Sequence, residues 1–96
     1  MDRGSLDRAF GYELRVRRQE AGLTIDQMWA ALRWRRGTYK RTEAGDRSMS
    51  PSDIFDVAEI LNISPTTFFA QARKRWKAGD YPSPTGVDEW RDILGL

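Results

Sequence analysis

Two Ser-Pro pairs, Ser50-Pro51 and Ser64-Pro65, constrain the fold of this chain more than any other feature of its sequence. Serine is a preferred helix N-cap and proline is favoured at the first helical position, so each pair predicts the start of a helix. Asp53, at the third position of the first of these helices, strengthens that prediction. The apolar residues that would form the buried faces are Ile54, Val57, Ala58 and Leu61 in the first helix and Phe68, Phe69, Ala72 and Trp76 in the second.

The N-terminal part of the chain predicts one longer helix. Ser5 is a candidate N-cap, and the helix is expected to end near Gly22. Gly11 is a weak point within it, because glycine is unfavourable in a helix interior. The residues at four-residue spacing that define its apolar face are Leu6, Phe10 and Leu14.

Two short helices are expected next. Thr24 is the N-cap of the first, and the second runs from Arg35 or Arg36 to Glu43 and is closed by Gly45. The buried face of the first is predicted to consist of Ile25, Met28, Trp29 and Leu32.

The composition changes after residue 79. Pro82 and Pro84 exclude a regular helix over residues 80–86 and predict a stiff linker. Residues 87–94 can form a short terminal helix with Val87, Trp90 and Leu94 on one side. With no alternating strand pattern, we expect an all-α fold. Its five-helix domain would occupy residues 1–79, and residues 80–96 would pack on that domain or on a partner.

The absence of cysteine and histidine weighs against an enzyme. The chain has no thiolate or imidazole to bind a metal and lacks the commonest general base. We therefore expect no metal, no cofactor, no catalytic residue and no small-molecule substrate. No apolar run approaches the roughly 20 residues that cross a bilayer, so we expect a cytoplasmic protein that does not enter the membrane.

Positive charge is concentrated in one part of the chain. Residues 33–47 carry six Lys/Arg and two Asp/Glu, a local excess of +4, whereas the net charge of the whole chain is +2. Such a segment can face a polyanion. A solvated arginine-rich helix face is an equally good explanation of the charge alone.

The two short helices and the three-residue turn between them, Arg33-Trp34-Arg35, have the form of a helix-turn-helix. In this motif the second helix lies in the major groove of DNA and the first crosses the phosphate backbone. With Tyr39 facing inward, the side chains expected to project toward a duplex belong to Arg36, Thr38, Lys40 and Arg41. Gly37 would let the helix approach the duplex closely.

Residues 11 to about 72 resemble the Cro/CI-type (XRE) helix-turn-helix family of phage repressors. The resemblance rests on three segments in the family's order and spacing: RQEAGLT at residues 18–24, EAG at residues 43–45 and VAEILNIS at residues 57–64. It implies a lambda-repressor-like domain of five helices, often dimeric, whose third helix contacts operator DNA. It also implies that Arg18 pairs with Glu43. Phosphate contacts are expected from Arg35, Arg47 and Ser48.

Four positions depart from the family's pattern. Ile25 replaces a glutamine that contacts DNA, and Trp29 replaces an alanine where the two helices cross. Arg33 replaces a turn glycine, so it would need the positive φ that glycine adopts without strain. Thr42 stands where a large aliphatic residue is expected. Trp29 either exchanges volume with the small residues near it or faces outward as part of an interaction surface.

The leading hypothesis is a sequence-specific regulator that binds double-stranded DNA, with repression by operator occupation in a phage or a bacterium as its expected action. The alternative is a protein-interaction module on the same fold, such as an antirepressor, exclusion or immunity protein. Four tryptophans support this alternative, since tryptophan is favoured at binding hot spots. A homodimer, a different protein partner and a monomer with its tail folded back all remain open. The candidate contact residues are Phe69, Trp76, Trp90 and Leu94.

Overall fold

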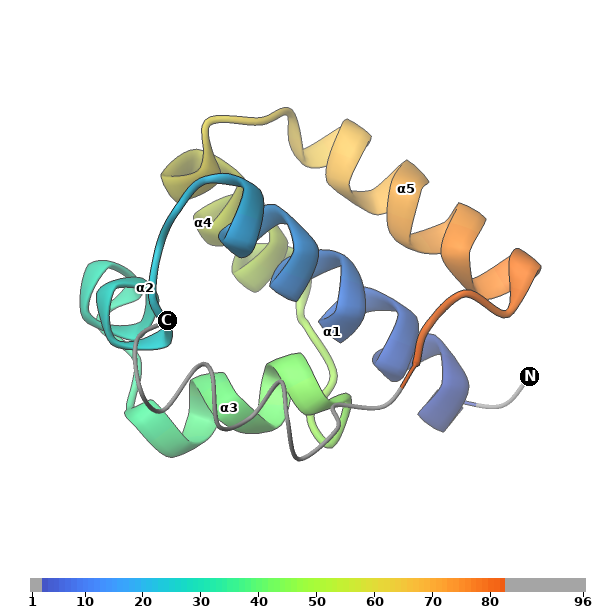
Figure 1. The fold of residues 1–96 in the computed structure, drawn as a ribbon, viewed down its shortest axis with the longest axis horizontal. Coiled ribbons are helices and arrows are strands. Elements are labelled where there is room, and N and C mark those ends of the chain that lie inside the picture. The colour runs from blue at the N-terminus through green and yellow to red at the C-terminus, as the bar shows by residue number, and fades with distance from the viewer. Residues whose placement is uncertain (1–2, 83–96) are drawn as a thin grey trace.

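The computed structural model of the chain describes residues 3–82. Over this range the fold is all-α, as predicted, and consists of five helices joined by short connections (Figure 1). The expected terminal helix at residues 87–94, including Trp90 and Leu94, lies outside the described residues. The helices are α1 (Arg3–Glu20), α2 (Ile25–Leu32), α3 (Arg36–Ala44), α4 (Pro51–Leu61) and α5 (Pro65–Ala78).

Helix α1 is the scaffold on which the other elements are arranged. In Figure 1, α3 and α5 flank α1 on opposite sides, and both pack against it. Helix α2 packs against α3 and α4, and α4 also packs against α5. The fully buried centre of the core is made by Leu14, Met28, Tyr39, Val57, Phe68 and Ala72.

Most helix starts follow the predicted caps. Thr24 forms a capping box with Gln27, and Ser50 forms one with Asp53. The side chain of Ser64 accepts a hydrogen bond from the N–H of Thr66 at the start of α5. These contacts satisfy N–H groups that a helix leaves without partners at its first turn.

Ser5 is not an N-cap, because α1 already begins at Arg3. The Ser5 side chain lies buried within the helix, and its hydroxyl accepts a hydrogen bond from Nε1 of Trp76 at 3.1 Å. The serine therefore joins α1 to α5 instead of starting a helix. Periodicity within one segment carries no information about such a long-range partner.

Gly11 is a close-contact residue and not a weak point. A Cβ atom placed there would lie 2.5 Å from the backbone oxygens of both Thr42 and Glu43. Helices α1 and α3 thus cross at a separation that only glycine permits. Glycine is unfavourable within a helix, but at this position it allows the close packing of α1 against α3.

Phe69 is not part of the buried face of α5. It is 49% exposed, whereas Phe68 and Ala72 are fully buried. Its ring nevertheless contacts the edge of Phe10, with 5.3 Å between ring centroids. Two adjacent phenylalanines on a helix point about 100° apart, so only one of them can face the centre of the core.

Candidate nucleic-acid interface

The α2–α3 turn has the geometry of a helix-turn-helix without its usual glycine. Arg33 adopts a left-handed conformation, with a φ of 61° and a ψ of 32°. The N–H of Trp34 donates to the carbonyl of Trp29 at 2.9 Å, which closes the end of α2. Arg35 then extends the chain and is the N-cap residue of α3. The departure predicted from the sequence is real, since a non-glycine residue occupies the positive-φ position.

Helix α3 is fastened to the scaffold along its inner side. Tyr39, Thr42 and Glu43 are buried. Nε of Arg18 donates to Oε2 of Glu43 at 2.8 Å, and the Arg18 Nη2 donates to Oε1 at 3.2 Å. Arg18 and Glu43 therefore form a bidentate ion pair in the place where the family resemblance puts one. A charge-assisted, bidentate pair of this kind fixes orientation as well as position.

Burial also changes the chemistry of Tyr39, the aromatic anchor of α3. Removal of its hydroxyl from water raises the pKa of Tyr39 far above its ordinary value, and the neighbouring Glu43 raises this pKa further. Tyr39 is therefore neutral at neutral pH, and its buried ring packs in the core. Its ring lies beside that of Trp34, with 6.1 Å between centroids.

The outer side of α3 and the turn before it carry several cationic residues. Arg33, Arg35, Arg36 and Arg41 are exposed, and Lys40 is half-buried. We call these five side chains the α3 basic surface. Gly37 is also exposed and has no atom within 4 Å of the position that its Cβ would take. Of these five residues, Arg35, Arg36, Lys40 and Arg41 were predicted contact residues and Arg33 was not.

Asp26 is the acidic residue within this surface, and the sequence reasoning missed it. Its Oδ1 accepts hydrogen bonds from Nε1 of Trp29 at 2.9 Å and from Nε of Arg36 at 3.3 Å. The hydrogen bond from Trp29, followed by the contact with Arg36, lowers the pKa of Asp26 despite some opposing desolvation. The carboxylate is therefore ionised at neutral pH and links α2 to the first residue of α3.

Trp29 combines the two roles that the sequence left open. It is half-buried and packs against the core, while its indole N–H points to the exposed Asp26. The side chain thus fills space between the helices and reaches the surface at one edge. An aspartate three residues before a tryptophan on a helix is the sequence signal that would have indicated this contact.

Arg47 is held within the protein by three contacts. Its guanidinium lies 4.9 Å from the ring centre of Trp34, its Nη1 donates to Oγ1 of Thr42 at 3.1 Å, and its Nη2 lies 3.0 Å from Oδ2 of Asp53. The predicted phosphate contact would have to be shared with these partners. Thr42 has a purpose that an aliphatic residue could not serve, because its hydroxyl accepts from Arg47 and donates to the carbonyl of Thr38.

Ser48, the other residue expected in a phosphate contact after α3, is exposed. Its hydroxyl donates to Oδ2 of Asp7 at 2.8 Å. The loop after α3 is therefore tied to α1 by Ser48, and to α4 and the helix-turn-helix turn by Arg47. Both side chains hold the loop in place beside the α3 basic surface.

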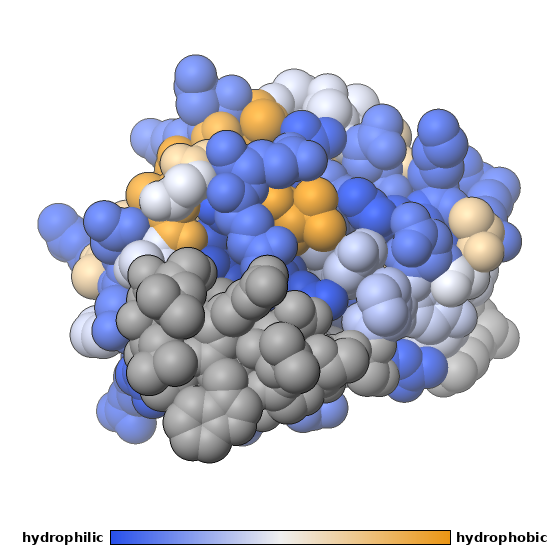
Figure 2. Space-filling view, in the orientation of Figure 1, coloured by the Kyte–Doolittle hydropathy of each residue, from blue (hydrophilic) through white to orange (hydrophobic). Residues whose placement is uncertain are grey.

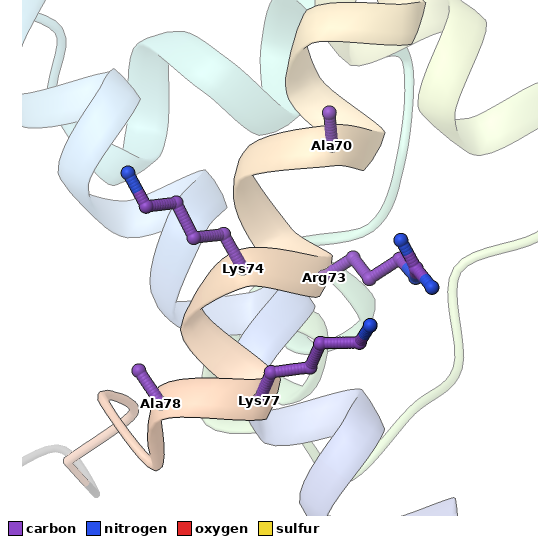
Figure 3. A pocket seen from close by; sticks show the side chains of 5 residues that line it. All are labelled: Ala70, Arg73, Lys74, Lys77 and Ala78. Atoms are coloured by element: carbon purple, nitrogen blue, oxygen red, sulfur yellow. The ribbon is translucent and has the colours of Figure 1, made fainter.

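A second basic group, which we call the α5 basic surface, consists of Arg73, Lys74 and Lys77. Together with Ala70 and Ala78 these residues line an open hollow of about 520 Å³ on the outside of α5. Figure 3 shows that Lys74 points away from Arg73 and Lys77, so the three charges do not converge on one point. The helix that carries this surface, α5, lies on the other side of α1 from α3 (Figure 1).

The described part of the face shown in Figure 2 is mostly hydrophilic, with small hydrophobic patches among polar residues. Within residues 3–82, no helix is long and apolar enough to cross a membrane. The same residues contain no group of three or more acidic, histidine or cysteine side chains arranged to hold a metal ion.

Comparison with known families identifies a helix-turn-helix domain. The sequence profile described as "Helix-turn-helix domain" matches residues 9–68, which include α2, α3 and α4 and most of α1. No curated protein and no solved structure matches the chain.

Proposed function

Because the chain belongs to the helix-turn-helix domain family, we propose that it is a regulator of transcription that binds double-stranded DNA with sequence preference. Its action would be repression, in a phage or a bacterium, by occupying an operator and excluding polymerase. The observation that carries this proposal is the α3 basic surface, which lies on the helix that this motif inserts into the major groove.

The residues divide by the kind of contact that their position allows. Arg36 and Lys40 lie on the same side of α3 one turn apart, where arginine can bond both major-groove acceptors of guanine and lysine can reach guanine or phosphate. Arg41 and Thr38 would flank them. Arg35, the N-cap residue of α3, would contact the phosphate backbone. Arg47 and Ser48 would support this backbone contact mainly by holding the loop.

We further propose that the chain binds DNA as a homodimer, since one recognition helix covers only a few base pairs. The candidate contact is the apolar surface between α4 and α5. Phe55 is 62% exposed and Phe69 is 49% exposed. Both line a hollow of about 300 Å³ together with Ile54 and the two helix-starting prolines. Trp76 is a weaker candidate, because its indole is bonded inward to Ser5.

Selection from a random-duplex library tests the proposal directly. We expect enrichment of a defined site, with two half-sites about 34 Å apart if a dimer binds. The logarithm of the affinity for that site should fall linearly with the logarithm of salt concentration. No duplex binding at low salt would falsify the proposal.

The alternative function, a protein-interaction module, is favoured by the same exposed Phe55 and Phe69. Sedimentation of the wild-type chain and a Phe55→Ser/Phe69→Ser variant separates the two uses of this surface. A homodimer predicts that the variant is monomeric and binds duplex more weakly. A module for another protein predicts a monomeric wild-type chain without duplex binding.

A further inference from the structure

Asp26 poses a physical question that the proposed function does not answer. A carboxylate within a basic surface repels the phosphates that the surface would attract, so it weakens general attraction to DNA. Asp26 is 70% exposed at its side chain, so it is not needed to neutralise a buried charge. An exposed ion pair of this kind adds little to stability. Asp26 also lies in the first turn of α2, where negative charge is favourable for the helix, but that position does not account for its contacts with Trp29 and Arg36.

These contacts supply an explanation for the presence of Asp26. Its Oδ1 receives the Arg36 Nε at 3.3 Å and the Trp29 Nε1 at 2.9 Å, so the carboxylate connects a half-buried indole to an exposed guanidinium. Trp29 is packed against the core and cannot move freely. Asp26 is thereby held in one orientation, and it in turn limits the rotamers of Arg36.

This contact leaves the two Nη groups of Arg36 available as hydrogen-bond donors. Only Nε is engaged by Asp26 among the contacts of Arg36 within the described residues. The two Nη groups can therefore donate to the N7 and O6 acceptors of one guanine. Because an arginine side chain loses much rotamer entropy on binding, holding it in advance reduces that loss.

We propose that Asp26, oriented by Trp29, is a positioning residue that holds Arg36 for contact with a single base pair. This inference rests on the proposed function, because it concerns the same α3 basic surface. It assigns a use to Trp29, which stands where the related family has alanine. Asp26 contributes to sequence discrimination and opposes non-specific attraction.

The test compares the base preferences of full-length variants on a random-duplex library. Arg36→Ala first identifies the base pair that Arg36 contacts, as the one pair whose preference disappears. Asp26→Asn keeps the shape of the side chain and removes its charge. We expect it to weaken preference at that same pair by about two- to fivefold, the range of an exposed ion pair, with preferences elsewhere unchanged. Affinity for unrelated duplex should stay equal or rise.

Trp29→Phe keeps a large ring in the core and removes only the N–H donor. We expect a loss of preference at the same base pair, but a smaller one than Asp26→Asn causes. In the Arg36→Ala background, Asp26→Asn should have no further effect on discrimination, since a positioning residue acts only through its partner. Thermal unfolding of each variant provides the check that the fold is retained.

Three results would overturn the inference. Asp26→Asn could keep the wild-type base preference at the base pair whose preference is lost in Arg36→Ala. That result would show that Arg36 needs no positioning. A change at a different pair would show that Asp26 itself contacts a base, for which the cytosine amino group is the chemical candidate. Equal losses at all pairs would show a structural effect only. If the wild-type chain enriches no duplex, the proposed function fails, and this inference fails with it.

Discussion

The α3 and α5 basic surfaces differ in how their charge relates to the helix that carries it. In α5 the basic residues occupy the C-terminal half, where positive charge interacts favourably with the helix dipole. In α3, Arg35 is the N-cap without a side-chain cap contact, and no acid lies in the first turn. Positive charge at that end is unfavourable for the helix.

The comparison teaches that the position of a charge is more informative than its amount. The charges of α5 are explained by helix stability alone. Helix stability does not explain the positive charges at the start of α3, which therefore point to a negatively charged partner outside the helix. Asp26 compensates part of this charge through its ion pair with Arg36. We propose that DNA compensates the rest.

The two helices also differ in their attachment to α1. Helix α3 supplies the acid, Glu43, to Arg18 of α1, and the two side chains are only 6% and 3% exposed. Helix α5 supplies the arginine, Arg75, to Glu13 of α1, and Glu13 also binds Arg17. Among the described residues, the carboxylate of Glu43 receives one arginine, which we call a closed pair, whereas the carboxylate of Glu13 is shared by two.

The largest effect is expected from two triple variants that separate the surfaces. Arg36→Ala/Lys40→Ala/Arg41→Ala removes three charges from α3. Arginine or lysine at a base edge contributes about 1–3 kcal/mol, so affinity for the selected duplex should fall by at least about 100-fold. Fluorescence anisotropy with that duplex at fixed salt measures the loss.

The matched control is Arg73→Ala/Lys74→Ala/Lys77→Ala in α5. Both triples change the net charge by the same amount, from +2 to −1, since each removes three positive charges. The α5 triple should alter affinity by less than about tenfold, because distant exposed charges are screened by salt. Equal losses in the two triples would mean that net charge, and not the α3 surface, determines binding.

The second effect concerns the attachment of α3. Glu43→Gln keeps the shape of the side chain but removes the carboxylate that Arg18 contacts at 2.8 Å. Loss of one partner from a buried pair typically costs about 3–5 kcal/mol, so the free energy of unfolding in urea should fall by that amount. Because this loosens α3 from α1, duplex binding should weaken as well.

Arg75→Gln is the corresponding change in α5. Glu13 keeps Arg17, whose Nε lies 2.6 Å from its Oε2, so no buried charge is left alone. The loss should stay near the value of a charged hydrogen bond, about 1.5–3 kcal/mol. Similar losses for Glu43→Gln and Arg75→Gln would contradict the distinction between a closed and a shared pair.

Local chemistry made much of this fold predictable. The capping residues Thr24, Ser50 and Ser64 begin helices through contacts within three residues, so they can be identified without a tertiary structure. Helical periodicity predicted a buried face of Ile25, Met28, Trp29 and Leu32, of which Ile25 and Met28 are buried and Trp29 and Leu32 are partly buried. The family resemblance, and not the local pattern, pointed to Arg18 and Glu43.

Contacts distant in the sequence account for what could not be predicted. Ser5 has the residue type of an N-cap, but Trp76, 71 positions away, determines its role. The role of Gly11 depends on the backbone of α3, which packs directly against it. Arg47 was expected to contact phosphate, but its contacts with Trp34 and Asp53 could not be predicted from the sequence.

The third effect tests the close approach of α1 and α3. In Gly11→Ala, the new methyl group would meet two backbone oxygens at 2.5 Å. Backbone atoms cannot rotate away, so we place the cost at the upper end of the roughly 1–3 kcal/mol typical of overpacking. This exceeds the gain of roughly 1 kcal/mol from replacing glycine with alanine in a helix. Urea unfolding should show a net loss, and an unchanged stability would mean that the two helices can separate freely.

The smallest expected effect is that of a single methyl group on the outside of each helix. Gly37→Ala places a methyl group in open space on the outside of α3, so stability should rise by roughly 0.5–1 kcal/mol. If this side of α3 lies against base pairs, the same methyl group should weaken duplex binding by a few fold. Stability and affinity then change in opposite directions, which urea unfolding and anisotropy measure separately.

The mirror variant in α5 is Ala70→Gly, at an exposed position within the α5 basic surface. It should lower stability by a similar roughly 0.5–1 kcal/mol and leave affinity unchanged, because the proposed function places no DNA against that helix. If Gly37→Ala also left affinity unchanged, α3 would not lie closely in the groove. Its basic side chains would then act on phosphates from a distance, and the difference between the two surfaces would be one of charge placement only.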